Sequence, residues 1–355
     1  MNSPLQAGDM YGGFNVLSVQ SLPEYRSHGI YLRHKTSGCR VYHVVNQDQE
    51  NLFAFGFKTP PRDNTGVSHI LEHAVLSGSE MFPIKDPFAE LIKGSMKTFL
   101  NALTYPDKTV YPASSTVEKD LFNMMLVYGD AVFFPLLRRE IFLQEGHRLE
   151  LNEAGEITVS GVVYNEMQGN YSSHESIVGE YSYRSLFTNS PYTYDSGGEP
   201  QEIPTLSYEA LLDYHKTYYH PSNCYIFLYG NIPTQQYLDF LENNFLSSFT
   251  TVSIDTSIPD QVRWNTPRYE ERTYPVGKEE SLEGKTTLCL NWLCNDVADT
   301  YSGLMLEIIA EALMGNPGSP LYKALIDSGL GEDISPSSGF DSTLKESTFT
   351  IGLRG

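Results

Sequence analysis

The chain has 355 residues, which is longer than a usual single domain and leaves ample material for a buried core. Apolar residues make up 40% of it and charged residues 19%, proportions that are ordinary for a soluble globular protein. The net charge of −20 disfavours nucleic acid as a partner and favours cationic partners, and no apolar run approaches the roughly 20 residues that a membrane helix requires.

The cysteines and the N-terminus both bear on the compartment. The opening "MNSPLQAGDMYGG" lacks a basic segment followed by an apolar one, which a signal peptide would have. The four cysteines show no CxxC spacing and are too few to staple a chain of this length, so we expect reduced thiols at Cys39, Cys224, Cys289 and Cys294. We therefore expect a cytoplasmic protein, and an organelle matrix fits the same features.

The first part of the chain reads as strands followed by helices. Short runs rich in β-branched and aromatic residues, separated by Gly, Ser, Asn and Asp, predict strands at 14–22, 29–34, 39–45, 51–57 and 223–231. Apolar residues at three- and four-residue spacing predict helices at 67–77, 118–133, 207–219 and 234–245. This mixture predicts the α+β class, with a mixed, largely antiparallel sheet covered by helices in a domain over residues 1–250.

A polar, Pro-rich stretch follows and predicts a linker over residues 251–286 that wraps over the surface, with part of it docked through Trp264. Residues 287–355 then open a second unit with a strand, a helix, a Pro-Gly turn and a short helix. This order weakly echoes residues 69–92, so we expect two related domains. We expect the second one to be truncated, because the strand-like run at 347–355 has no helix after it.

Three polar residues interrupt the otherwise apolar segment "SHILEHAVLSGS": His69, Glu72 and His73. At positions i, i+3 and i+4 they share one helical face, where burying two imidazoles and a carboxylate costs free energy unless something satisfies them. Two imidazoles one turn apart can hold a single Zn²⁺, and the order H-x-x-E-H is an inverzincin signature. The motif therefore predicts that Glu72 takes a proton from zinc-bound water as that water attacks a carbonyl carbon.

A tetrahedral catalytic zinc site needs a third protein ligand, which spacing does not select. Glu145 and Glu166 are the candidates, since acids nearer to the motif lie too close along the chain, and Glu166 sits in an apolar setting. The competing interpretation is a chance match to a short pattern, with the histidines as ordinary core or surface residues. Against it, three polar groups on one apolar face need several partners at once, and a metal ion supplies them together.

Further motifs follow the H-x-x-E-H segment: "TFLNALTYPDKTVYP", "GVVYNEMQG", "YHPSNCYIFLYGN" and "SPLYKALIDSGLGEDISPSSGF". With them the chain resembles, over nearly its whole length, the pitrilysin/insulinase family of zinc metallopeptidases, and within it the presequence protease and falcilysin branch. The resemblance implies four related α+β domains in two halves that close on a chamber where peptides are cut. It implies His69, His73 and Glu166 as ligands of one zinc ion and Glu72 as the general base.

The resemblance also implies substrate contacts. Asn101 and Ala102 correspond to a strand that pairs with the backbone of an extended peptide, so affinity comes from main-chain hydrogen bonds. Leu76, Phe88 and Ile92 match positions that line an apolar pocket beside the scissile bond, and plain core packing is the competing interpretation for each. The expected substrates are short unstructured peptides such as targeting presequences, and the acidic balance favours basic ones.

The resemblance implies a much longer protein, whose C-terminal half contributes an Arg and a Tyr to the substrate site. We therefore expect this chain to be an N-terminal portion that binds zinc but cleaves peptides weakly or not at all without its missing C-terminal half. The alternative is a non-catalytic peptide-binding or scaffold member of the family, which usually arises by loss of metal ligands. The intact H-x-x-E-H favours the protease. No nucleic acid or membrane partner is expected.

Overall fold

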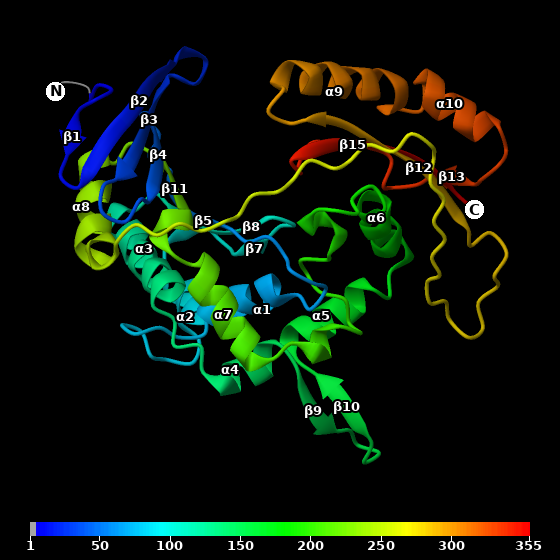
Figure 1. The fold of residues 1–355 in the computed structure, drawn as a ribbon, viewed down its shortest axis with the longest axis horizontal. Coiled ribbons are helices and arrows are strands. Elements are labelled where there is room, and N and C mark those ends of the chain that lie inside the picture. Colours follow the sequence, from blue (N-terminus) through cyan, green and yellow to red (C-terminus); the bar gives the residue numbers. More distant parts are fainter. Residues whose placement is uncertain (1–4) are drawn as a thin grey trace.

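The computed structural model describes residues 5–355, which form two larger sheets with helices packed against them and a separate two-stranded hairpin. Figure 1 shows the larger sheet near the N-terminus at one end of the molecule and the smaller sheet near the C-terminus at the other. Both sheets are wholly or largely antiparallel, so the predicted α+β class is confirmed. No helix among the described residues combines the length and the apolar character that crossing a membrane requires.

The larger sheet has nine strands within the described residues, in the order β1-β2-β3-β4-β11-β5-β8-β6, with β7 also paired to β8. Neighbours run antiparallel except β4 and β11, which run parallel, because β11 returns from late in the chain and inserts between β4 and β5. The strands are β1 (Met10–Tyr11), β2 (Phe14–Leu22), β3 (Ser27–His34), β4 (Arg40–Val45), β5 (Asn51–Lys58), β6 (Lys97–Leu100), β7 (Leu103–Thr104), β8 (Lys108–Ser115) and β11 (Cys224–Gly230).

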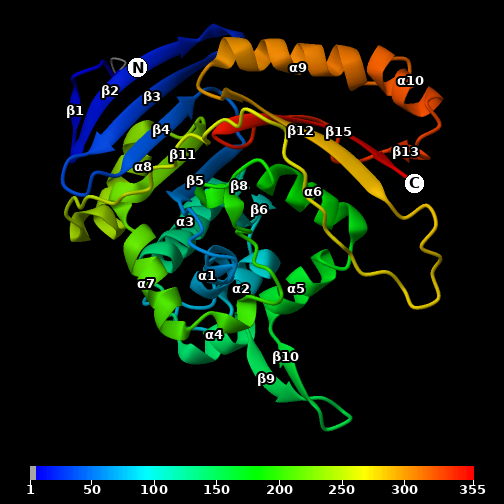
Figure 2. The same ribbon diagram turned by 45° about the vertical axis from the view of Figure 1, so that its right-hand side comes forward.

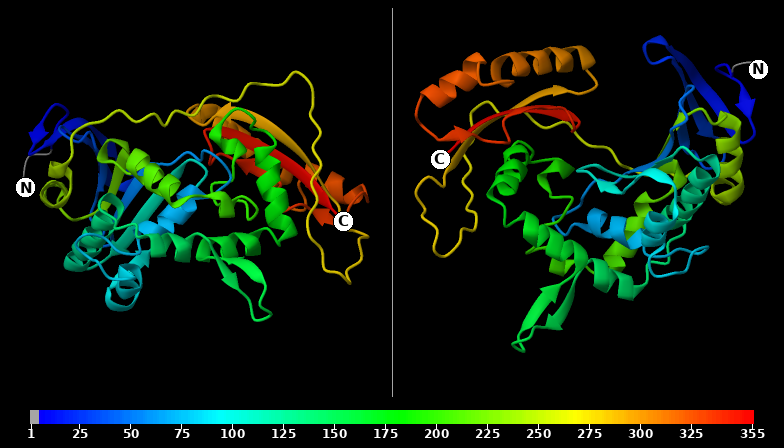
Figure 3. Two further views of the ribbon diagram at one scale, coloured as in Figure 1. Left: turned by 60° about the horizontal axis from the view of Figure 1, so that its bottom comes forward. Right: turned by 180° about the vertical axis from the view of Figure 1, so that it is seen from behind.

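Helices and a hairpin complete this first unit. Figure 3 shows the β9–β10 hairpin projecting from the helical side of the unit. The helices are α1 (Val67–Val75), α2 (Pro87–Gly94), α3 (Glu118–Phe133), α4 (Arg139–Glu145), α5 (Val162–Asn170), α6 (His174–Arg184), α7 (Tyr208–Tyr218) and α8 (Thr234–Asn244), and the hairpin strands are β9 (Arg148–Leu151) and β10 (Ile157–Ser160). The predicted helices correspond to α1, α3, α7 and α8, whereas α2, α4, α5 and α6 were not predicted.

The core lies between the larger sheet and α3. Phe53, Phe55 and Phe57 occupy alternate positions of β5, so they point to the same face, and each is at most 1% exposed. They contact Tyr128 and Phe133 of α3 at ring-centroid distances of 5.7–5.9 Å. Burial of each such ring contributes about 1.5–3 kcal/mol. This packing fixes β5, and the chain leaves β5 to enter α1.

The second unit repeats the topology that surrounds α1. Its elements are β12 (Thr287–Asp296), α9 (Thr300–Met314), α10 (Pro320–Asp327), β13 (Asp333–Ile334), β14 (Gly339–Asp341) and β15 (Glu346–Arg354), and Figure 2 shows α9 and α10 along one side of β12 and β15. β15 pairs antiparallel with β12 and with both short strands, as β8 does with β5, β6 and β7. The predicted repeat is confirmed in topology. Only the first copy has the H-x-x-E-H motif, because α9 contains no histidine.

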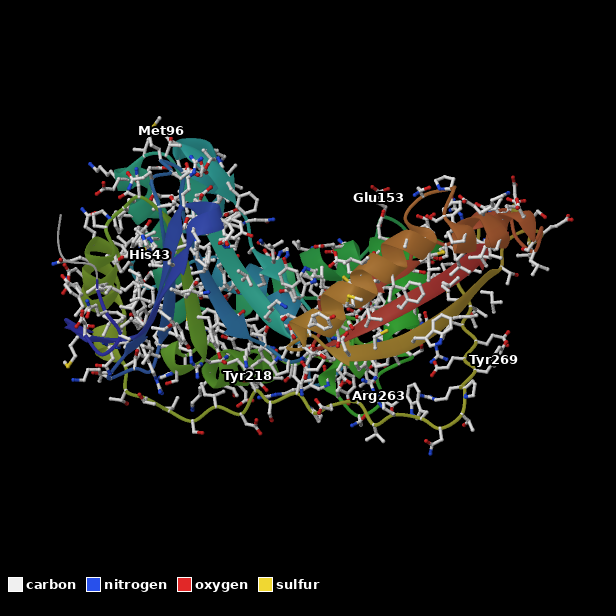
Figure 4. All side chains as sticks on the ribbon, turned by 90° about the horizontal axis from the view of Figure 1, so that it is seen from above. His43, Met96, Glu153, Tyr218, Arg263 and Tyr269 are labelled. Carbon is white, nitrogen blue, oxygen red and sulfur yellow. The ribbon has the colours of Figure 1, made fainter. Side chains whose placement is uncertain are left out.

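Residues 251–286 contain no helix or strand and run along the outside of both units; Figure 4 labels Arg263 and Tyr269 on this segment. The segment is docked chiefly at Gln261, which is 4% exposed, rather than at Trp264, which is 37% exposed. The Gln261 N–H donates to Glu346 of β15, and the Gln261 side chain accepts from the Thr188 N–H of the first unit. The boundaries 1–250, 251–286 and 287–355 stay a prediction.

The close packing of α3 gives a test of the core. A Cβ at Gly129 would lie 2.3 Å from the buried Phe245 ring, whereas a Cβ at Gly179 of α6 meets nothing within 4 Å. Gly129→Ala gains about 1 kcal/mol of helix propensity but forces an overpacking cost of about 1–3 kcal/mol, so we expect a net loss of stability. Gly179→Ala is the matched control and should be neutral or stabilising. Urea unfolding measures both, and a Gly129→Ala midpoint at or above wild type would contradict this packing.

Candidate active site

Helix α1 places the H-x-x-E-H residues on one side of a deeply packed helix. It begins after Gly66, whose φ of 67° is left-handed and suits glycine. Ile70, Leu71, Ala74 and Val75 are at most 1% exposed, so the apolar positions pack into the core. His69 and Glu72, on the other side, are still only 9% and 8% exposed. Their polar atoms therefore depend on partners in the protein or on a bound ligand.

Three donor atoms converge beside α1. The Oε2 of Glu166, on α5, lies 3.7 Å from Nε2 of His69 and 3.9 Å from Nε2 of His73. The three atoms lie within 4.8 Å of one another. Four ligands at about 2.1 Å from a tetrahedral zinc ion lie roughly 3.4 Å apart, so the two distances from Glu166 to the histidines exceed the ideal by only a few tenths of an ångström. The donor set fits a zinc ion of the two-histidine, one-glutamate type.

The other nitrogen of each imidazole is already held by the protein. Nδ1 of His69 donates to the Gly197 carbonyl at 3.2 Å, and Nδ1 of His73 donates to Oε2 of Glu145 at 3.2 Å. A hydrogen on Nδ1 leaves the Nε2 lone pair free to bind a metal, so these two outer contacts select the tautomer that both histidines need.

The structure distinguishes Glu145 from Glu166, the two acids that spacing left as candidates for the third ligand. Glu145, at the end of α4, is 8% exposed and contacts the outer nitrogen of His73, whereas Glu166 faces the inner nitrogens.

Burial lowers the pKa of His73, but its hydrogen bond to Glu145 and the charges of Glu72, Glu145 and Glu166 together raise it above its ordinary value. Burial raises the pKa of Glu145, and its hydrogen bonds to His73 and Gln144 bring it below the ordinary value.

Glu72 lies between the histidines on the same face of α1. Its Oε2 accepts a hydrogen bond of 2.6 Å from the Thr104 hydroxyl on β7. Among residues 5–355, Oε2 is the only Glu72 oxygen that accepts a hydrogen bond, so the other oxygen is available to a reacting group. Thr104 thus orients Glu72 toward the cavity that both residues line.

A cavity of about 740 Å³ opens in front of the donors. Four of the five predicted substrate residues line it: Leu76, Phe88, Asn101 and Ala102. Ile92 does not, and its side chain is 47% exposed. On α2, Phe88 and Leu91 turn toward the core, and Ile92 follows Leu91 by about 100° of helix rotation, which carries it to solvent. Ile92 thus lies outside the cavity lining, and its assignment to a substrate pocket stays a prediction.

The segment Leu100–Leu103 is an interrupted edge, not the continuous strand that was expected: β6 ends at Leu100 and β7 begins at Leu103. The Asn101 N–H donates to Pro112, and its carbonyl accepts from the Tyr128 hydroxyl, so both main-chain groups are used inside the protein. The Ala102 N–H is held by the Asn101 side chain. The Asn101 N–H is thus already used, whereas its carbonyl oxygen can accept a second hydrogen bond, and main-chain pairing of Asn101 and Ala102 with a peptide stays a prediction.

A polar network among the residues that line the cavity was not predicted from the sequence. Glu180 and Asp195 line the cavity, and Arg184 of α6 contacts Glu180 at 3.7 Å and Glu199 at 2.7 Å. Burial and then the charge of Asp195 raise the pKa of Glu180 to about 8. No pattern in the sequence marks these residues, because the loop that carries Asp195 is brought to the site only by tertiary packing.

Two family models match the chain. The one described as Insulinase (Peptidase family M16) matches residues 54–177, and the one described as Peptidase M16 inactive domain matches residues 205–355. The chain belongs to the M16, or insulinase, family of peptidases. It is 43% identical to Protein HypA of Clostridium perfringens and 40% identical to the mitochondrial presequence protease of Xenopus tropicalis, over 97% and 98% of its length. It covers 35% and 34% of those proteins, so it spans about a third of the length of the M16 relatives that it matches.

A solved structure supports the same fold. The crystal structure of pitrilysin superimposes with a TM-score of 0.66 at 19% sequence identity, over 96% of this chain and 35% of pitrilysin. This superposition shows the shared fold, whereas the two family models and the relatives confirm the predicted insulinase-family resemblance.

The raised pKa of Glu180 predicts a pH dependence of stability. The folded protein keeps this proton up to about pH 8, whereas an unfolded glutamate releases it near 4.5. Stability should therefore fall as pH rises between these values, by about 1.4 kcal/mol per pH unit at most. Glu180→Gln removes this decline, so the variant should gain stability relative to wild type as pH rises from 5 to about 8. Urea unfolding across that range measures it, with the exposed Glu209→Gln as control, and parallel wild-type and Glu180→Gln profiles would contradict it.

Proposed function

We propose that this chain carries the zinc site and the proton-transferring glutamate of a metalloendopeptidase that hydrolyses short unstructured peptides. The observation that carries the proposal is the convergence of Nε2 of His69, Nε2 of His73 and a carboxylate oxygen of Glu166 within 4.8 Å. These three residues hold one Zn²⁺, and Glu145 and the Gly197 carbonyl orient the imidazoles from behind. The M16 membership supports the same chemistry.

When bound, zinc supplies a Lewis acid that polarises the scissile carbonyl and makes a nearby water more acidic. Glu72 accepts the proton of the attacking water on its carboxylate and then delivers it to the nitrogen of the leaving amine. The Thr104 hydroxyl holds the other oxygen of Glu72, so the carboxylate does not rotate away during this transfer. The buried side of α1 restricts water access to the donors from the core side.

The charge of the cavity supports basic peptides as the preferred substrates. Six acidic residues and one lysine line it: Glu72, Asp86, Glu145, Glu166, Glu180, Asp195 and Lys85. Glu180 is protonated below about pH 8, so it adds no charge there. One zinc ion offsets two of the negative charges, and the remaining carboxylates attract a cationic segment. One relative is named a mitochondrial presequence protease, and we propose presequence-like peptides as substrates of this chain as well.

A further part of the same protein is the expected partner. The chain spans about a third of its M16 relatives, and the second unit exposes apolar side chains along α9, including Leu304 at 57% and Ile308 at 55%. We propose that a C-terminal half covers this face and completes the peptide chamber. Cytoplasm is the expected compartment, and the mitochondrial relative makes an organelle matrix the alternative.

Zinc content tests the metal site directly. We expect about one zinc per purified wild-type chain, and loss of most of it in His69→Ala and Glu166→Ala. Glu72→Gln should keep its zinc, because Glu72 is not a ligand in this proposal. Exposed residues supply matched controls, His28→Ala for the histidine and Glu209→Ala for the glutamate. Zinc that is absent from wild type, or retained by both ligand variants, would reject the site.

Peptide cleavage tests the role of Glu72. Glu72→Gln should lower kcat for a fluorogenic peptide by at least about 100-fold while zinc content stays at the wild-type level. The assay is run on this chain, where we expect slow turnover, and on the longer protein to which we assign it. If the longer wild-type protein binds zinc and peptide but does not cleave, the non-catalytic scaffold function is the correct one.

A further inference from the structure

The loop 194–199 lies between the two helices that carry the proposed zinc ligands. Asp195, within it, is 5% exposed, and both of its carboxylate oxygens are used. Oδ1 accepts the Gly197 N–H at 2.8 Å, and Oδ2 accepts the Tyr171 hydroxyl at 2.6 Å. The Asp195 main-chain N–H donates to the Asn64 side chain at 2.9 Å. A buried carboxylate with these three connections has a single position.

On one side this loop forms hydrogen bonds with residues at the start of α1. The Ser196 carbonyl accepts from the Ser68 hydroxyl at 3.0 Å, and the Gly197 carbonyl accepts from Nδ1 of His69 at 3.2 Å. A Cβ at Gly66 would lie 2.5 Å from the Gly197 carbonyl oxygen, so the two backbones are in direct contact. Oδ1 of Asp195 holds the Gly197 N–H, and the Asp195 carbonyl accepts from the Gly198 N–H at 3.2 Å. Asp195 therefore restrains both peptide planes that flank Gly197, including the one with the carbonyl that orients His69.

On the other side the loop holds the end of α5. Tyr171 is the residue that follows the last turn of α5, five positions beyond Glu166. Its hydroxyl bond to Asp195 therefore ties the C-terminal end of the Glu166-bearing helix to the loop. Gly197 also packs on α5, since a Cβ there would lie 2.8 Å from Cε of Met167.

We propose that Asp195 is a positioning residue for the metal donors: through Gly197 it orients His69, and through Tyr171 it sets the place of α5 and hence of Glu166. It contacts none of the three donor atoms itself, so it acts on metal affinity by holding two helices at the right separation. Arg184 supports the same loop, donating to Asn64 at 3.0 Å and to the Thr193 carbonyl at 3.0 Å.

The test measures zinc affinity by chelator competition on purified chains, alongside thermal unfolding of the metal-free proteins. Asp195→Ala should weaken zinc binding roughly 10–100-fold. Asp195→Asn keeps an acceptor for the Gly197 N–H and should recover most of that loss. Asp48→Ala is the matched control: Asp48 also accepts a backbone N–H two residues on and a tyrosine hydroxyl, from Glu50 and Tyr229, but in a loop between β4 and β5 away from α1. It should bind zinc as wild type does.

A second readout does not depend on metal. In metal-free Asp195→Ala the Gly197 N–H should exchange with solvent faster than in wild type, because its acceptor is lost. Should Asp195→Ala fail to fold, Tyr171→Phe decides the question, since it keeps the ring, removes only the hydroxyl bond, and should weaken zinc binding by roughly 3–10-fold.

The inference rests on the proposed function, and the two fail differently. Wild-type chain without stoichiometric zinc would overturn both. Wild-type zinc binding with unchanged affinity in Asp195→Ala, or in Tyr171→Phe where that variant decides, would overturn the positioning role alone. An equal loss of affinity in Asp48→Ala would also overturn it, because the effect would then be one of general destabilisation.

Discussion

Burial of two imidazoles and a carboxylate on α1 is the constraint around which the first unit is arranged. Each of these groups must recover, inside the protein, the hydrogen bonds that it loses in water. The structure supplies one partner to each: Gly197 to His69, Glu145 to His73 and Thr104 to Glu72. These partners come from three different segments, and all three lie on the side away from the inner nitrogens. What remains unpaired is one lone pair on each Nε2, both facing Glu166.

The repeat of topology separates what the fold needs from what the chemistry needs. In both units, two long antiparallel strands flank a helix, a shorter helix and two short strands, so this arrangement forms without a metal motif. In α9 the positions that face outward are apolar and exposed, whereas in α1 the corresponding face is polar and buried against α4, α5 and the loop 194–199. The site therefore arises from the extra elements packed around one copy of a common unit.

The sequence predicts the parts of the site that depend on local periodicity. His69, Glu72 and His73 share a face because helical spacing requires it, and the strands at 14–57 follow from alternation. The choice between Glu145 and Glu166 depends on how α4 and α5 pack on α1, and the sequence alone carries no measure of that. Ile92 lies outside the cavity lining because one residue of helix rotation separates the core-facing Leu91 from the exposed Ile92. Asp195 was not predicted because a loop that mixes polar and apolar residues has no regular spacing from which a common face could be inferred.

Six acidic residues and one lysine line the cavity, and their placement links metal binding to substrate binding in our proposal. Carboxylates that serve as ligand, base and orienting partner must lie close together, so they repel one another in the low-dielectric cavity. A divalent cation relieves that repulsion at the ligands, whereas Asp195 and Glu180 line the same cavity and are not ligands in our proposal. Asp195 is held by hydrogen bonds, and burial and then the charge of Asp195 raise the pKa of Glu180 to about 8. The aspartate that we propose to position the donors is thus also one of the acidic residues lining the cavity that we propose to attract a basic peptide.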